Sequence, residues 1–149
     1  MKKIQVIMCY LLTICVIIRV INLVGVYMGK NKIKVILESS ETKNTNNTTA
    51  TIEDNNIKYK EPDATNVTLN TKDNILIREN EKLLMEFNFD IDKITENTLY
   101  VKDLKQTLII IIKTMNIICK KNYYKVEYEI IDNDKFNYIV EVGVTNEQD

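Results

Sequence analysis

The sequence predicts an α+β protein with an N-terminal transmembrane helix, a disordered linker and a small two-layer domain. Three observations lead to this prediction. The first segment is almost entirely apolar, the next is polar, and the last half alternates between apolar and polar residues around one long apolar run. The expected organisation is an anchor over residues 1–29, a juxtamembrane segment and flexible linker over 30–72, an α+β domain over 73–145 and a tail over 146–149.

Residues 4–28 are long enough for a membrane-spanning helix, because about 20 residues cross the hydrocarbon core of a bilayer. A cleaved signal peptide is disfavoured, since the glycines that could precede a cut leave Leu23 or Tyr27 at the position that should be small. A lipoprotein cut before Cys15 is disfavoured because Ile14 precedes it. The segment therefore predicts a retained signal-anchor of a single-pass membrane protein.

Three polar side chains of this segment fall on one side of a helix: Gln5, Arg19 and Asn22. A charge near the middle of a bilayer is costly and usually faces a partner. We therefore expect these residues to contact another membrane protein. The alternative is that the Arg19 side chain reaches the headgroup region.

Basic residues on the two sides of this span are nearly balanced, so the positive-inside rule gives little preference. With only three residues ahead of the span, an amino terminus in the cytoplasm is favoured. The C-terminal domain would then be extracytoplasmic.

Residues 38–56 are polar, with almost no apolar side chain, and predict a flexible tether that continues to about residue 71. A short alternating segment, residues 32–37, precedes it.

The predicted domain begins with a hairpin and continues with a helix. A strand over residues 75–78 and a turn at 79–81 precede strict alternation over 83–91. Residues 103–122 then predict a helix of about five turns that covers the sheet. The β-branched run over 108–112 makes a strand the alternative there.

The C-terminal hairpin has its turn at residues 132–134. Alternation over 124–130 and 136–144 defines its two strands. Tyrosines concentrate in the domain, and this residue is favoured at interfaces. Tyr123, Tyr128 and Tyr138 are the candidate interface residues, and ordinary packing in the sheet is the alternative.

Composition argues against most catalytic chemistry. The chain has no histidine, so templates that use a histidine base or ligand do not apply, and no catalytic residue, metal site or cofactor is predicted. Cys119 is expected to be a small buried apolar residue. The net charge of −1 and the presence of only two arginines disfavour nucleic acid as a partner. No small-molecule substrate is evident.

The expected function is that of a membrane-anchored protein with a non-catalytic extracytoplasmic interaction or assembly domain. An accessory subunit of an envelope, secretion or pilus-type complex fits this layout by analogy of architecture. The alternative is a surface or envelope glycoprotein of an AT-rich virus or parasite, suggested by glycosylation sequons at Asn46, Asn47 and Asn66. A small enzyme that uses carboxylates or Cys119 is the third hypothesis.

Overall fold

The structure, a computed structural model, describes residues 30–143. These residues form ten β-strands. The strands are β1 (Lys30–Ser39), β2 (Lys43–Glu53), β3 (Asn56–Lys60), β4 (Asn66–Asn70), β5 (Ile75–Glu79), β6 (Leu83–Asn88), β7 (Ile94–Val101), β8 (Gln106–Lys120), β9 (Tyr123–Ile130) and β10 (Lys135–Val142).

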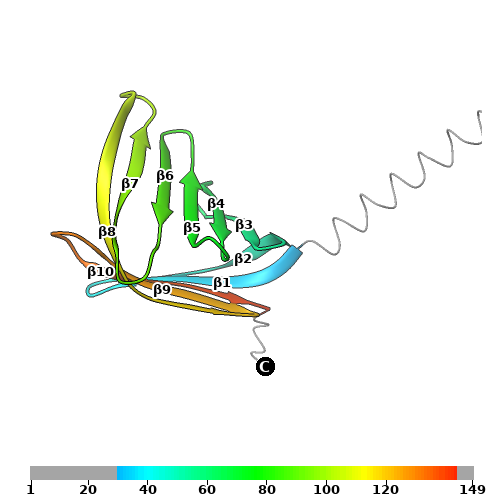
Figure 1. Ribbon diagram of the computed structural model, residues 1–149. Coiled ribbons are helices and arrows are strands. Elements are labelled where there is room, and N and C mark those ends of the chain that lie inside the picture. The colour runs from blue at the N-terminus through cyan, green and yellow to red at the C-terminus, as the bar shows by residue number, and fades with distance from the viewer. Residues whose placement is uncertain (1–29, 144–149) are drawn as a thin grey trace, which may run out of the picture. The chain divides into compact units, whose positions relative to one another are not determined.

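The ten strands close into one antiparallel barrel (Figure 1). Each strand from β2 to β9 pairs with the next along the chain, and β1 lies between β10 and β2. Closure gives every strand two hydrogen-bonded neighbours, so the barrel has no free sheet edge. The β7–β8 hairpin is long, and in Figure 1 it reaches beyond the ends of β5 and β6.

Alternate side chains of each strand point into the barrel and fill it. The pairing register joins one inward-facing row across β3 to β8, and this row consists of Tyr59, Val67, Arg78, Met85, Leu99 and Leu108. Val67 and Tyr59 are almost fully buried, which identifies the row as interior. The row brings one charged residue, Arg78, to the inside of an otherwise apolar wall.

Aromatic rings form the middle of the core. Phe87 and Phe89 meet edge to face with ring centroids 6.3 Å apart, and Tyr128 lies 5.1 Å from Phe89. Phe136 stacks on Tyr128 at 5.5 Å. These contacts join strands β6, β9 and β10 across the interior, in the offset and edge arrangements that aromatic pairs favour.

The predicted α+β class is wrong, because the residues that the structure describes form a sheet throughout and the expected covering helix is a strand. Residues 106–120 form β8, which pairs with β7 on one side and β9 on the other. The physical reason is the β-branched isoleucine run, whose side chains suit a pleated strand better than a helix. A bulge between Thr114 and Asn116 bends β8 along the barrel wall.

The expected flexible linker is also absent between residues 30 and 70, where β1 to β4 form part of the barrel. Strand β2 is polar because its outward side chains face water, while Ala50 and Ile52 face the core. Threonine favours extended backbone, and the neighbouring strands supply the hydrogen bonds. A strand that is buried on one side only therefore needs few apolar residues.

Both predicted hairpins are confirmed. Strand β5 pairs with β6, and β9 pairs with β10 around a turn that includes residues 132–134. Asp132 has a φ of 63°, a left-handed conformation that Asp and Asn tolerate in turns. The predicted inward face of the C-terminal hairpin is the buried one, with Tyr124, Val126, Tyr138 and Val140 in the core.

The predicted transmembrane helix falls on residues 1–29, outside the described residues. Among residues 30–143 there is no helix that could span a bilayer. The described residues thus offer no helical span for the predicted single-pass membrane localisation, and the signal-anchor is not proposed again.

Candidate functional site

The predicted membrane contacts Gln5, Arg19 and Asn22 lie outside the described residues. Of the predicted interface tyrosines, Tyr128 and Tyr138 lie inside the barrel and are 5% and 4% exposed. These two tyrosines therefore pack in the core, which is the alternative that the sequence left open for them.

Tyr123 is half-buried on the outer side of β9, where it pairs with Lys120 and Glu141. Cys119 differs from expectation, because it is exposed and lines a recess at one end of the barrel.

The three sequons are not equivalent in the fold. Asn47 and Asn66 are exposed, whereas Asn46 faces the barrel and the nitrogen of its side-chain amide is buried. A glycan attached to that nitrogen would require the side chain to leave the interior.

The most unusual surface feature is the β7–β8 hairpin. Seven large hydrophobic residues of the described chain are exposed, and five of them lie between Ile94 and Ile111. Their exposed fractions are 64% for Ile94, 65% for Leu104, 49% for Leu108, 57% for Ile109 and 41% for Ile111. Clustering of this kind marks interaction surfaces, whereas isolated exposed apolar residues are ordinary.

Three of these residues share the outer face of the hairpin. Ile109 and Ile111 are two apart on β8, and Ile94 on β7 lies diagonally opposite Ile111, because Ile94 pairs with Lys113 and Glu96 pairs with Ile111. We call Ile94, Ile109 and Ile111 the hairpin surface. Strand β8 is apolar on its inner side as well, which is the pattern of strands buried on both faces.

Two residues of opposite charge adjoin the hairpin surface, since Glu96 lies opposite Ile111, and Lys113 lies opposite Ile94 on β7 and Glu129 on β9. Glu96 and Lys113 are both exposed and lie on the same outer face as the isoleucines. Within residues 30–143, neither side chain belongs to a salt bridge. The face therefore combines apolar side chains with Glu96 and Lys113, and Glu129 of β9 adjoins it beside Lys113.

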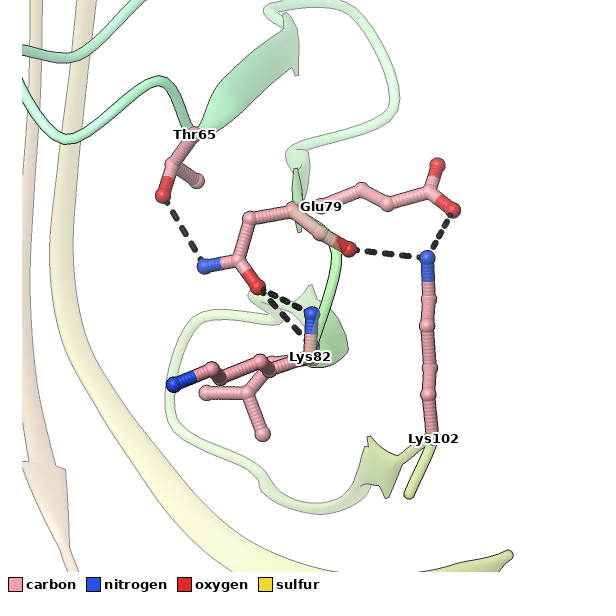
Figure 2. Close-up of polar contacts among 6 residues, drawn as sticks. Thr65, Glu79, Lys82 and Lys102 are labelled. Atoms are coloured by element: carbon pink, nitrogen blue, oxygen red, sulfur yellow. Dashed lines mark hydrogen bonds and ion pairs between the residues drawn. The ribbon is translucent and has the colours of Figure 1, made fainter.

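A wide recess of about 780 Å³ lies near the β5–β6 turn. Part of its polar lining forms the network drawn in Figure 2, in which Asn80 and Lys102 bind each other, Glu79 binds Lys102, and Lys82 takes part through its backbone only. The Asn80 side chain donates to Oγ1 of Thr65 at 3.1 Å and accepts from the backbone of Lys82 at 2.9 Å. Lys102 Nζ donates to Glu79 Oε1 and to the Asn80 carbonyl, each at 2.8 Å. This network holds the turn in place, while the side chains of Lys60, Glu81 and Lys82, which also line the recess, form no hydrogen bond or ion pair within residues 30–143.

A second recess, of about 390 Å³, lies at one end of the barrel interior. We call it the Arg78 recess. Val35 and Leu37 of β1 form apolar parts of its wall, and Asn46, Glu61, Asp63 and Arg78 are among its polar residues. Its size is within the range of small-molecule sites.

Arg78 forms an ion pair with Glu61 in this recess. Burial opposes the charge on Arg78, but the hydrogen bond and the charge of Glu61 outweigh burial and raise the pKa of Arg78. Arg78 is therefore a cation at neutral pH and has Glu61 as its partner in the ion pair. Asp63 leaves the recess slightly anionic.

Two donors of the recess have no acceptor. Arg78 Nε and Asn46 Nδ2 are both buried, and neither has a hydrogen-bond partner. A buried donor without an acceptor costs roughly 1–3 kcal/mol. Their presence in one recess indicates a place that an acceptor would complete.

The hydroxyls of Tyr59 and Tyr138 lie next to the recess and contact each other at 2.6 Å. Tyr138 pairs with Leu37, and Tyr59 shares the inward-facing row of Arg78. One hydroxyl donates to the other, which leaves one O–H free as a donor. Burial raises the pKa of both tyrosines, so both stay protonated at neutral pH.

Sequence reasoning missed both sites. The run over residues 108–112 contained the signal for the hairpin surface, since five successive apolar residues in a strand place apolar groups on both faces. The Arg78 recess had no such signal, because Asn46, Glu61 and Arg78 meet only through the closure of the barrel. Among residues 30–143, no group of three or more acidic or cysteine side chains is placed to hold a metal ion.

Comparisons with known proteins bear on the fold alone. No protein-family model matches the sequence, and no curated protein is similar to it. The chain is similar to a solved structure, the crystal structure of the ywiB protein from Bacillus subtilis, with 14% sequence identity and a TM-score of 0.50. The likeness covers 77% of this chain and 91% of that chain. It shows that the barrel fold occurs in another protein.

Proposed function

We propose that this chain is a non-catalytic assembly protein that associates through its β7–β8 hairpin, and that the occupant of the hairpin surface is a second copy of the chain. The observation that carries the proposal is the concentration of exposed large apolar residues on this one hairpin. The role as an interaction or assembly domain, which the sequence led us to expect, is thus retained as a proposal. Its membrane anchoring is not, and the analogy to envelope, secretion or pilus machines is dropped because it depended on a layout of span, tether and hairpin–helix domain.

Hydrophobic burial supports association. An isoleucine that passes from full exposure to full burial contributes about 1.5–3 kcal/mol. Ile94, Ile109 and Ile111 are between 41% and 64% exposed, so each would contribute part of that amount. Two copies would bury twice this set.

Charge supports a second copy as the occupant. A two-fold interface brings the same patch of both subunits together, so the patch must complement itself. The outer face carries Glu96 and Lys113 beside the isoleucines, and Glu129 of β9 lies opposite Lys113. Rotation of one copy by 180° can place Glu96 of each subunit near Lys113 of the other, which favours this pairing over a like-charged one.

The experiment measures the mass of the full chain by sedimentation equilibrium. The test variant carries Ile109→Thr and Ile111→Thr, because threonine keeps the β-branched side chain that a strand favours while it removes apolar surface. The control carries Ile75→Thr and Ile77→Thr, two half-buried positions on the outer side of β5.

We expect a dimer for the natural sequence and the control, and a dissociation constant raised at least tenfold in the test variant. A monomeric natural chain, or equal weakening by both variants, would contradict the proposal. If the chain binds a different protein through Ile109 and does not self-associate, the occupant of the hairpin surface is that protein and not a second copy.

A further inference from the structure

The Arg78 recess leads to an inference that is independent of the hairpin surface. We propose that the recess binds a small neutral molecule that presents a carbonyl-type oxygen to Arg78 Nε and Asn46 Nδ2 and places an apolar body against Val35 and Leu37. The site is built from β1, β2 and β5 together with the residues that follow β3. The hairpin surface lies on β7 and β8.

Donors without acceptors define the polar half of the ligand. Arg78 Nε and Asn46 Nδ2 are buried and unpartnered, and both residues line the same recess. A carbonyl oxygen has two lone pairs and can accept from two donors. An acceptor oxygen therefore matches what Arg78 Nε and Asn46 Nδ2 lack.

Charge argues against an anionic ligand, and a cationic ammonium has no lone pair with which to accept from the two donors. Arg78 is already paired with Glu61, and Asp63 adds a negative charge at the edge of the recess. A carboxylate ligand would meet the charge of Asp63 without a free cation to balance it. A ketone or carboxamide avoids this repulsion and still accepts two hydrogen bonds.

The recess combines this polar end with an apolar wall. Val35 is buried and Leu37 packs against the core, so both hold fixed positions. Burial of most of a small ligand, with a few placed polar groups for orientation, is the usual composition of small-molecule sites. A six-membered carbocycle with one carbonyl is within the size of a 390 Å³ recess.

The test titrates the full chain, labelled with ¹⁵N, with three probes that share one ring: cyclohexanone, cyclohexanecarboxylate and cyclohexylammonium. The chain has only two arginines, Arg19 and Arg78, so the Nε–H region of the spectrum is simple. Loss of one signal in Arg78→Lys assigns it. We expect cyclohexanone to shift the Arg78 Nε–H and Asn46 amide signals in a saturable way, and the other two probes to bind at least tenfold more weakly.

Variants test the donors one at a time. Asn46→Ala removes one donor, and Arg78→Lys removes Nε–H while it keeps a cation for Glu61. Each is expected to weaken cyclohexanone binding by roughly three- to tenfold, the effect of about one lost hydrogen bond. Asn47→Ala is the matched control, because Asn47 is the next residue on the same strand but is exposed on the outer face.

Two results would overturn the proposal. One is the absence of any saturable shift with cyclohexanone at concentrations where the ring stays soluble. The other is equal or tighter binding of cyclohexylammonium or cyclohexanecarboxylate. If either variant fails to fold, as judged by circular dichroism, the ranking of the three probes on the natural chain still decides the outcome.

Discussion

The phenolic oxygens of Tyr59 and Tyr138 lie 2.6 Å apart inside the barrel, although 79 residues separate them in the sequence. This hydrogen bond joins β3 to β10 across the interior. Both side chains are buried, so neither hydroxyl can exchange its partner for bulk water. The pair is a polar link, within an apolar core, between two segments that are far apart in the sequence.

Removal of one hydroxyl of this pair should lower the unfolding free energy by more than half of the loss that removal of both hydroxyls causes. Tyr59→Phe or Tyr138→Phe leaves a buried hydroxyl without a partner and should cost about 1–3 kcal/mol of unfolding free energy. The double variant should cost less than the sum of the two, with a coupling of at least about 0.5 kcal/mol. Urea unfolding of the four proteins gives the cycle, and strict additivity would show that the hydroxyls do not interact.

Alkaline pH should unfold the protein through its buried tyrosines. Burial raises the pKa of Tyr128 to about 12 and raises the pKa values of Tyr59, Tyr124 and Tyr138. A group with a raised folded-state pKa contributes stability that is complete below its unfolded value of about 10 and is lost as pH rises through the folded value.

The contribution of the buried tyrosines to stability should therefore be constant up to about pH 10 and decline above it. Absorbance at 295 nm should show a group of tyrosines that ionise late and together with loss of circular dichroism. Ionisation of all eight tyrosines near pH 10 in a folded protein would contradict the buried positions.

The ion pair between Arg78 and Glu61 should be more costly to break than to replace. Arg78→Leu leaves Glu61 without its cation, and Glu61→Gln leaves Arg78 without its anion. Each substitution should lower the unfolding free energy by roughly 1–3 kcal/mol. This is less than for a fully buried pair, because the side chains of Arg78 and Glu61 are 34% and 20% exposed. The double variant should recover part of the loss in thermal unfolding, whereas a double variant that loses the full sum would exclude coupling.

Asn97 is a buried polar residue that the fold requires. It is 1% exposed, accepts from the backbone of Asn88 at 2.6 Å and donates to Thr95. Asn97→Ala should lower the unfolding free energy by roughly 2–4 kcal/mol, because it leaves the Asn88 N–H without its acceptor and opens a small cavity. Thr98→Ala, at the exposed neighbouring position, should change it by less than about 0.5 kcal/mol. Similar values for the two variants would contradict this role.

The turn drawn in Figure 2 should depend on the Asn80 side chain and not on that of Lys82. Asn80 binds the backbone of Lys82 and Leu83 and the hydroxyl of Thr65. Asn80→Ala should cost about 1–2 kcal/mol in urea unfolding. Lys82→Ala should be close to neutral, since the Lys82 side chain makes no hydrogen bond or ion pair within the described residues. A larger effect at Lys82 would assign the stability of the turn to charge.

The sequence predicts the hairpins of this barrel well because their alternation has one buried and one solvated face. In β9, Tyr124 and Val126 face the core and Lys125 faces outward, where it pairs with Glu127. Such a pattern indicates both the strand and its orientation. It does not indicate whether the sheet is covered by a helix or closed on itself.

Strands β8 and β2 could not be recognised by that pattern, for opposite physical reasons. In β8, residues 108–112 are apolar on both faces, so the period of two is lost. In β2, only Ala50 and Ile52 contribute to the core, and the remaining positions are polar. Both segments are strands because the barrel closes around them, which is a tertiary effect that overrides local composition.

The most direct test of the proposed assembly is a cross-linking measurement at the hairpin surface. The photoreactive residue p-benzoylphenylalanine replaces Ile109 in the full chain, and equal amounts of ¹⁴N and ¹⁵N protein are mixed before irradiation. We predict mixed-isotope cross-links from position 109 to peptides of β7 or β8 in the other copy. Cross-links confined to a single copy, or directed only to strands on the opposite side of the barrel, would contradict association through this hairpin.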